Sequence, residues 1–258
     1  MKGPAGVTAL VLGEVAAGGA AFLFLTPLWN EVRRGFFTLT GIVILVAAVA
    51  AWRSAAAGLV EGSGSGLWAM RLAGTLAGVT LVWVVLLVLR RAAATRVVGV
   101  VSVPLSAAML AAMAGTAEGS AVVGFLQLLA GAAFLGAVTD GLLLGHWYLT
   151  DRGLSRTPIN RSTTFLIVAV VAETAAVIGG GFGPTRANSH FNPLLTSAGL
   201  ASWIGLGMVA ATALIAGLIR AALRGTRASA VQAATGFFYL AVITAMTAEF
   251  AAKVRFLP

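Results

Sequence analysis

A few ionisable side chains lie within long apolar stretches of this 258-residue chain. Each costs about 2.5–3.5 kcal/mol to place in hydrocarbon on insertion scales, so such groups mark proton paths or binding sites. Glu14, Asp140 and Glu173 have no opposite charge three or four residues away. Each needs a partner from another segment, water or a bound proton. Glu249 precedes Lys253 by four residues, the spacing of a surface ion pair. These four carboxyls predict proton transfer.

The densest polar stretch is 139–152, which includes Asp140 and the consecutive residues His146, Trp147 and Tyr148. At about 100° per residue on a helix, Trp147 returns to the azimuth of Asp140, whereas His146 does not share a face with Asp140. The three consecutive residues suit an interfacial anchor, because aromatic residues gather at membrane surfaces. They equally suit a quinone headgroup site, since imidazole and phenol groups donate hydrogen bonds and a nearby carboxyl accepts protons.

A second polar stretch occurs near the start of the last apolar segment. Gln232, Thr235, Gly236 and Tyr239 are spaced i, i+3, i+4 and i+7, which places them on one helix face. We expect this face to point at protein or a cavity. It either joins His146 in a pocket at one membrane face, with Gln232 and Tyr239 binding the cofactor, or makes ordinary hydrogen bonds between helices.

The elements that hold these residues are predicted from hydropathy. The composition is 59% hydrophobic and 10% charged, with a mean hydropathy of +0.98. An apolar helix of about 20 residues crosses a bilayer. The sequence predicts an all-α polytopic bundle and a single transmembrane domain, 1–258, with no soluble domain. Its eight spans are predicted at 7–28, 38–60, 67–89, 97–117, 121–149, 163–183, 194–218 and 228–252.

The net charge of +9 follows membrane topology. The only charged residues or histidines in the even-numbered connections are Glu61, Glu118, Arg186 and His190. Arginines gather in the odd-numbered connections: Arg33, Arg34, Arg90, Arg91, Arg96, Arg152, Arg156, Arg161, Arg220, Arg224 and Arg227. By the positive-inside rule, the odd connections face the cytoplasm and both termini lie outside, in a multi-pass protein of the inner (plasma) membrane. Lys253 and Arg255 fall on the outer side, against this rule. Lipids, not nucleic acid, are the expected surroundings.

The chain contains no cysteine, so it cannot itself ligate an iron–sulfur cluster or attach a c-type haem. We predict no metal-ligand cluster. His146 and His190 are the only histidines, and the predicted topology places them at opposite membrane faces, about 30 Å apart. A haem held by both is therefore not expected.

Two short stretches resemble a known family. The first span reads GEVAAGGAAF at 13–22, and the last reads AEFAAKVRF at 248–256. They resemble the opening and terminal motifs of the NrfD-like membrane anchors of dimethyl sulfoxide and polysulfide reductases. Eight spans with both termini outside fit the dimethyl sulfoxide branch. Lys253 stands where that family has arginine, and its Leu-Gly-x-Pro loop after the second span has no counterpart. The resemblance implies a haem-free, quinone-interacting subunit with an iron–sulfur partner, and carries over Glu14, Glu249 and Lys253.

The expected function is that of a membrane subunit of a larger respiratory-type complex, anchoring iron–sulfur or other redox subunits and handling quinone, protons or both. His146 and Tyr148 would donate to the headgroup, Asp140 would accept a proton and Glu173 would relay it. By depth, we expect His146, Asp140, Glu173 and then Glu14 with Glu249 to form a ladder across the bilayer. A proton-coupled transporter or channel is the alternative, and a b-type cytochrome subunit the second alternative.

Overall fold

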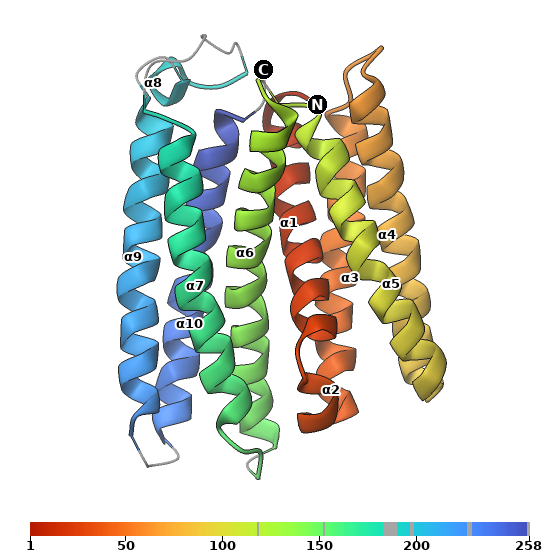
Figure 1. Cartoon of the computed structure of the whole chain (residues 1–258), viewed down its shortest axis with the longest axis vertical. Helices are drawn as coiled ribbons and strands as arrows, with labels where there is room; N and C mark the ends of the chain where they lie inside the picture. Colours follow the sequence, from red (N-terminus) through yellow and green to blue (C-terminus); the bar gives the residue numbers. More distant parts are fainter. Residues whose placement is uncertain (118, 152, 183–189, 197–198, 226–228, 257–258) are drawn as a thin grey trace.

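The computed structural model describes residues 1–117, 119–151, 153–182, 190–196, 199–225 and 229–256. Eight long helices lie side by side as one bundle (Figure 1). They are α1 (Gly3–Leu25), α3 (Arg34–Ala57), α4 (Gly64–Val88), α5 (Ala92–Ala114), α6 (Ala121–Thr150), α7 (Thr157–Gly179), α9 (Leu200–Leu223) and α10 (Ser229–Val254). All eight are long and apolar enough to cross a membrane, which confirms the predicted all-α polytopic bundle. Two short helices, α2 (Leu28–Glu31) and α8 (Pro193–Thr196), lie between them.

The first helix, α1, lies in the interior of the bundle. It contacts α3, α5, α6 and α10, and 72% of its most apolar window is buried, against 28–50% for the other seven spans. A helix that is apolar all round belongs in such a position. Small residues bring it close to α6, since a Cβ built on Gly18 would lie 2.9 Å from the Cα of Gly136.

Helix boundaries differ from the predicted ones by up to six residues. Five helices begin three to six residues before the predicted start, because the helix includes polar residues that hydropathy leaves out, whereas α9 begins at Leu200, six residues after its predicted start. The first span begins at Gly3, where Pro4 occupies a favoured first-turn position, and ends before Pro27. The sixth begins at Thr157 with Pro158 in the same role. Gly183 and Ala228, the predicted limits of the sixth and eighth spans, lie outside the described residues.

The two ends of the bundle differ. We call the end at which α1, α4, α6 and α9 finish the arginine end, and the end at which α1 begins and α10 finishes the terminal end (Figure 1). At the arginine end, Arg161 binds the Glu31 carboxylate through two nitrogens, at 2.9 and 3.0 Å. This bidentate pair joins α7 to α2. Four of the loop charges used for the topology, Arg152, Arg227, Glu118 and Arg186, lie outside the described residues.

Candidate functional site

A buried ion pair joins the first and last helices of the chain. Lys253 Nζ on α10 lies 2.8 Å from Glu14 Oε1 on α1 and 2.8 Å from Glu249 Oε2, one turn earlier on its own helix. The side chains are 3% exposed for Lys253 and 0% for both glutamates. The predicted pairing of Glu249 with Lys253 is thus confirmed, but the prediction that it is a surface pair is wrong.

Glu173 on α7 completes this group, which we call the acid–lysine cluster: Glu14, Glu173, Glu249 and Lys253. The carboxyl of Glu249 interacts with those of both Glu14 and Glu173. Glu173 is 1% exposed, and its Oε2 has no hydrogen-bond partner among the described residues. Three carboxylates and one ammonium would carry a net charge of −2 on side chains that are almost fully buried. Such a charge is costly unless protons or cations neutralise it.

The backbone of α6 makes room for these carboxyls at Gly131. A Cβ at this position would lie 2.8 Å from the Cδ of Glu14 and 2.9 Å from Glu249 Oε2, closer than real Cβ atoms approach. A residue with a side chain here would push the glutamates apart. The glycine therefore lets α6 close one side of the acid–lysine cluster.

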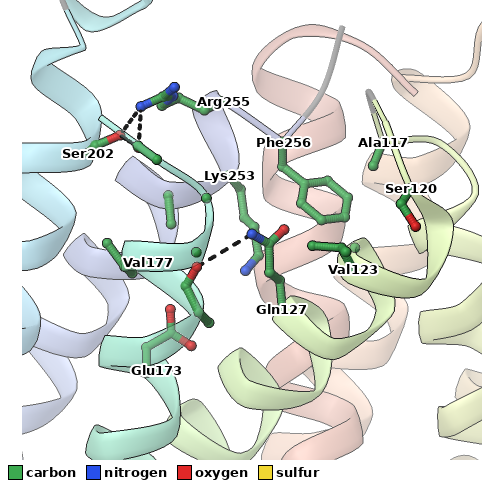
Figure 2. Close-up of a pocket in the computed structure, with 16 residues that line it drawn as sticks. Ala117, Ser120, Val123, Gln127, Glu173, Val177, Ser202, Lys253, Arg255 and Phe256 are labelled. Carbon is green, nitrogen blue, oxygen red and sulfur yellow. Dashed lines mark hydrogen bonds between the residues drawn. The ribbon is translucent and has the colours of Figure 1, made fainter. Parts of the chain in front are cut away.

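A cavity of about 240 Å³ leads to the acid–lysine cluster from the terminal end of the bundle (Figure 2). Lys253 and Glu173 line it, and its outer part includes Ser120 and Gly180, both exposed. Gln127 lies on one wall and donates a hydrogen bond to the Ala176 carbonyl on α7, at 3.4 Å. Polar groups thus extend from the surface to the buried carboxyls, an arrangement suited to water and protons.

The residues after α10 form one side of this cavity. Arg255 donates to the Gly181 carbonyl at 2.6 Å and to the Ser202 hydroxyl, which fastens the end of α10 to the start of α9. The Phe256 ring lies 5.8 Å from Lys253 Nζ, near the distance of a cation–π contact. Figure 2 shows the ring beside Val123, and both residues line the cavity.

Asp140 is not part of this cluster. It is 2% exposed and lies against α1 and α3, where a Cβ on Gly19 would be 3.0 Å from Ile44 and 3.8 Å from Asp140 Oδ1. Neither carboxylate oxygen has a hydrogen-bond partner among the described residues. The expected ladder is therefore wrong in one respect: Glu173, Glu14 and Glu249 form a single group, and Asp140 stands alone.

His146, Trp147 and Tyr148 point in three directions. His146 Nε2 lies 2.8 Å from the Tyr239 hydroxyl on α10, which confirms that His146 and Tyr239 are neighbours. The Trp147 ring lies against Gly35 of α3, on the side of α6 that carries Asp140. The Tyr148 hydroxyl donates to the Ser155 carbonyl. The sequence prediction that Asp140 and His146 occupy different faces is correct, and the residues do not converge on one pocket.

The expected inward-facing stripe on α10 is largely on the surface of the chain. Thr235 is buried against Gly145, but Gln232 and Gly236 are exposed and Tyr239 is 47% exposed. Within this chain only Thr235 of the four is covered, because α6 packs on that side of the helix. The His146–Tyr239 pair consequently lies on an outer face of the bundle.

Sequence reasoning missed Gln127, Arg255 and the central position of Lys253. Gln127 had a signal, since it is a polar residue near the middle of an apolar segment. The resemblance names Lys253, but its contact with Glu14 depends on tertiary packing, which the spacing along the chain does not predict. His190 contacts Gly3 at the terminal end, whereas His146 lies near the arginine end, so the histidines are at opposite ends as expected. Among the described residues, no three histidine, aspartate or glutamate side chains, the three glutamates of the cluster included, are placed so that they could together hold a metal ion.

No family model matches this chain, and no curated protein or solved structure matches it either.

Proposed function

We propose that this chain is an integral membrane protein that binds and transfers protons at the acid–lysine cluster, as a subunit of a larger respiratory-type redox complex. The observation that carries the proposal is the burial of three glutamates around one lysine below a cavity that opens at the terminal end. A cluster with two carboxylates more than its cations must take up protons or cations, and its charge changes with each one.

Each residue has a role in this proposal. Glu173, which lines the cavity and has a carboxylate oxygen without a hydrogen-bond partner among the described residues, exchanges protons with water. Glu249 lies next to it and passes the proton toward Glu14. Lys253 forms ion pairs with Glu14 and Glu249, and its positive charge means that the cluster needs two protons for neutrality and not three. Under the positive-inside orientation, the arginine end is cytoplasmic and the cavity opens outside.

The test is proton flux into proteoliposomes that contain the purified full chain and a pH-sensitive dye, driven by a potassium diffusion potential. Glu173→Gln keeps the shape of the side chain but cannot ionise, and we expect it to lower the flux on the order of 100-fold, as losing a proton-transfer group does. Glu61→Gln is the matched control, because Glu61 is exposed in a connection at the same end. Equal fluxes for wild type and Glu173→Gln would refute the role of the cluster.

The membership of a complex needs its own measurement. Purification from the native membrane in mild detergent, followed by mass spectrometry and an optical redox spectrum, should recover stoichiometric iron–sulfur or other redox subunits. If the chain instead purifies alone and still conducts protons, the function is that of a proton channel or proton-coupled transporter. The resemblance of the Glu14 and Glu249–Lys253 stretches to NrfD-like anchors favours the complex.

A second candidate is quinone binding at His146 and Tyr239. Their side chains meet at 2.8 Å, and Tyr239 is half exposed on a face that apolar side chains such as Leu240 and Ile243 surround. A lipid-soluble quinone would reach this pair from the bilayer and accept a hydrogen bond from either group. We expect Tyr239→Phe to weaken binding of a short-chain quinone about 5- to 10-fold, the loss of one hydrogen bond. Quenching of tryptophan fluorescence measures it, and unchanged quenching would reject the site.

A further inference from the structure

Asp140 is the buried acid that the acid–lysine cluster does not use. Both of its oxygens are buried, and among the described residues no side chain pairs with it or donates to it. An ionised carboxylate in such a place costs several kcal/mol, so the neutral, protonated form is the one that fits. A protonated carboxyl still presents a donor and an acceptor, and buried groups of this kind are nearly always hydrogen-bonded to protein or to water.

Two other polar atoms, one on α3 and one on α6, share this condition. Thr40 Oγ1 on α3 and Trp147 Nε1 on α6 are buried without a hydrogen-bond partner among the described residues. For Thr40 this is unusual within this chain. The other buried threonines of the long described helices each donate to the carbonyl four residues earlier, at 2.8–2.9 Å: Thr80, Thr95, Thr163, Thr212 and Thr235. The Thr40 hydroxyl is thus available to another partner.

The three residues lie at successive depths toward the arginine end. Asp140 is beside Gly19, together with Ile44 of α3. Thr40 precedes Ile44 by one helical turn on the same face, and the Trp147 ring meets Gly35 close to the start of α3. Asp140 and Trp147 are seven residues apart on one face of α6, about 10 Å along the axis. The orphaned polar atoms therefore form a line from the middle of the bundle to the arginine end.

A backbone contact separates this line from the acid–lysine cluster. Gly131, which faces the cluster, is nine residues before Asp140 on α6, and the Gly18–Gly136 contact lies between them. A Cβ on Gly136 would lie 2.7 Å from the Cα of Gly18, so the two backbones touch and leave no space for water between α1 and α6. Protons cannot pass along this interface from Asp140 to Glu14.

We propose that Asp140 is a second proton-binding site, distinct from the acid–lysine cluster, and that it exchanges protons with the arginine end through water molecules held by Thr40 and Trp147. The proposal rests on the proposed function and deepens it. A protein that moves protons between the two ends of the bundle needs a proton-binding site that each end can reach. The cluster serves the terminal end and Asp140 the arginine end. The Gly18–Gly136 contact keeps the two apart in this conformation.

Infrared spectroscopy tests the proposal without altering Asp140. The chain has two aspartates, Asp140 and Asp151, and Asp151 is ion-paired with Arg33 at 3.2 Å. Aspartate labelled with carbon-13 at its side-chain carboxyl therefore identifies the absorption of a protonated Asp140. We expect a label-sensitive band of a protonated carboxyl at neutral pH in the full chain in nanodiscs, and its shift on transfer to deuterated water. The absence of a label-sensitive protonated band would overturn the proposal.

The route is tested by the rate of that shift. Thr40→Val keeps the shape of the side chain and removes the hydroxyl, and we expect it to slow hydrogen–deuterium exchange at Asp140 about 5- to 10-fold, the effect of losing one hydrogen bond. Thr80→Val is the matched control, since Thr80 is equally buried but bonded within its own helix, and it should leave the rate unchanged. An unchanged rate in Thr40→Val would overturn the route.

The two proposals fail separately. Glu173→Gln should alter glutamate bands and proton flux while leaving the labelled aspartate band and its exchange in place. If Glu173→Gln has no effect on flux but the Asp140 band behaves as expected, the role of the cluster is refuted and the Asp140 site stands. If flux depends on Glu173 while Thr40→Val exchanges as fast as wild type, the cluster stands and the Asp140 route is refuted.

Discussion

Replacing Lys253 with methionine should destabilise the protein in a pH-dependent way. Lys253 makes both of its 2.8 Å ion pairs inside the bundle, and methionine fills a similar volume without charge. Removing one partner of a buried ion pair costs about 3–5 kcal/mol, because the remaining charge has no compensation. In this cluster, the variant can avoid that charge by binding one more proton on Glu14 or Glu249.

The cost of that proton sets the expected magnitude. Protonating an ordinary glutamate at pH 7 costs about 3–4 kcal/mol, since each pH unit above its half-protonation point costs about 1.4 kcal/mol. The folded variant then holds one proton more than the folded wild type, so the penalty of the substitution relative to wild type shrinks as the pH falls. We expect the penalty of Lys253→Met relative to wild type to be about 3–4 kcal/mol at pH 7 and below about 1 kcal/mol near pH 4.5.

The assay is unfolding of the purified protein in mixed micelles, followed by circular dichroism at both pH values. Lys2→Met is the matched control, because Lys2 and Lys253 are the two lysines of the chain and Lys2 is exposed. The double variant Lys253→Met with Glu249→Gln should recover most of the loss at pH 7, because one fewer carboxyl needs a proton. A penalty that is the same at both pH values, or no recovery in the double variant, would refute the charge argument.

Three further predictions concern packing and hydrogen bonds, each measured by the same unfolding assay. Gly136→Ala should cost about 1–3 kcal/mol, since its Cβ would meet the backbone of α1, while Gly78→Ala, with open space around it, should be neutral or slightly stabilising; equal effects would contradict the close contact. Tyr148→Phe should cost about 1 kcal/mol by removing its bond to a loop carbonyl, and no loss would mean that the bond contributes nothing. Arg161→Lys should cost less than about 1 kcal/mol, because its pair with Glu31 is partly exposed, and a larger loss would mean that the pair is shielded from water.

The spans could be predicted because their signal is local. Twenty apolar residues in a row can only be buried or in lipid, and all eight predicted segments correspond to helices of the structure. The boundaries shifted because residues such as Arg34 and Thr157 are polar but still helical, so hydropathy alone excluded them. The charge pattern correctly separated the two ends of the bundle, because the described arginines of the odd connections lie near one end.

The composition of the candidate site could be predicted only in part. Apolar surroundings marked Glu14, Glu173 and Asp140 as buried acids, and all three are buried. Which of them meet depends on how helices far apart in the sequence rotate against one another, and helical periodicity within one segment carries no such information. The choice of His146 and Tyr148 as a joint site failed for a related reason, since adjacent residues on a helix diverge by about 100°.

The pairing of Glu14 with Lys253 places a demand on biogenesis. Helix α1 is made before α10, and the cation that pairs with Glu14 lies in α10, after six other spans. Throughout that interval Glu14 has to remain protonated, or α1 has to wait where water can reach it. Arrival of α10 supplies Lys253, and only then does α1 become fully enclosed between α3, α6 and α10. The ion pair can therefore form only once α10 is in place, and a chain that stops before α10 leaves Glu14 without its cation.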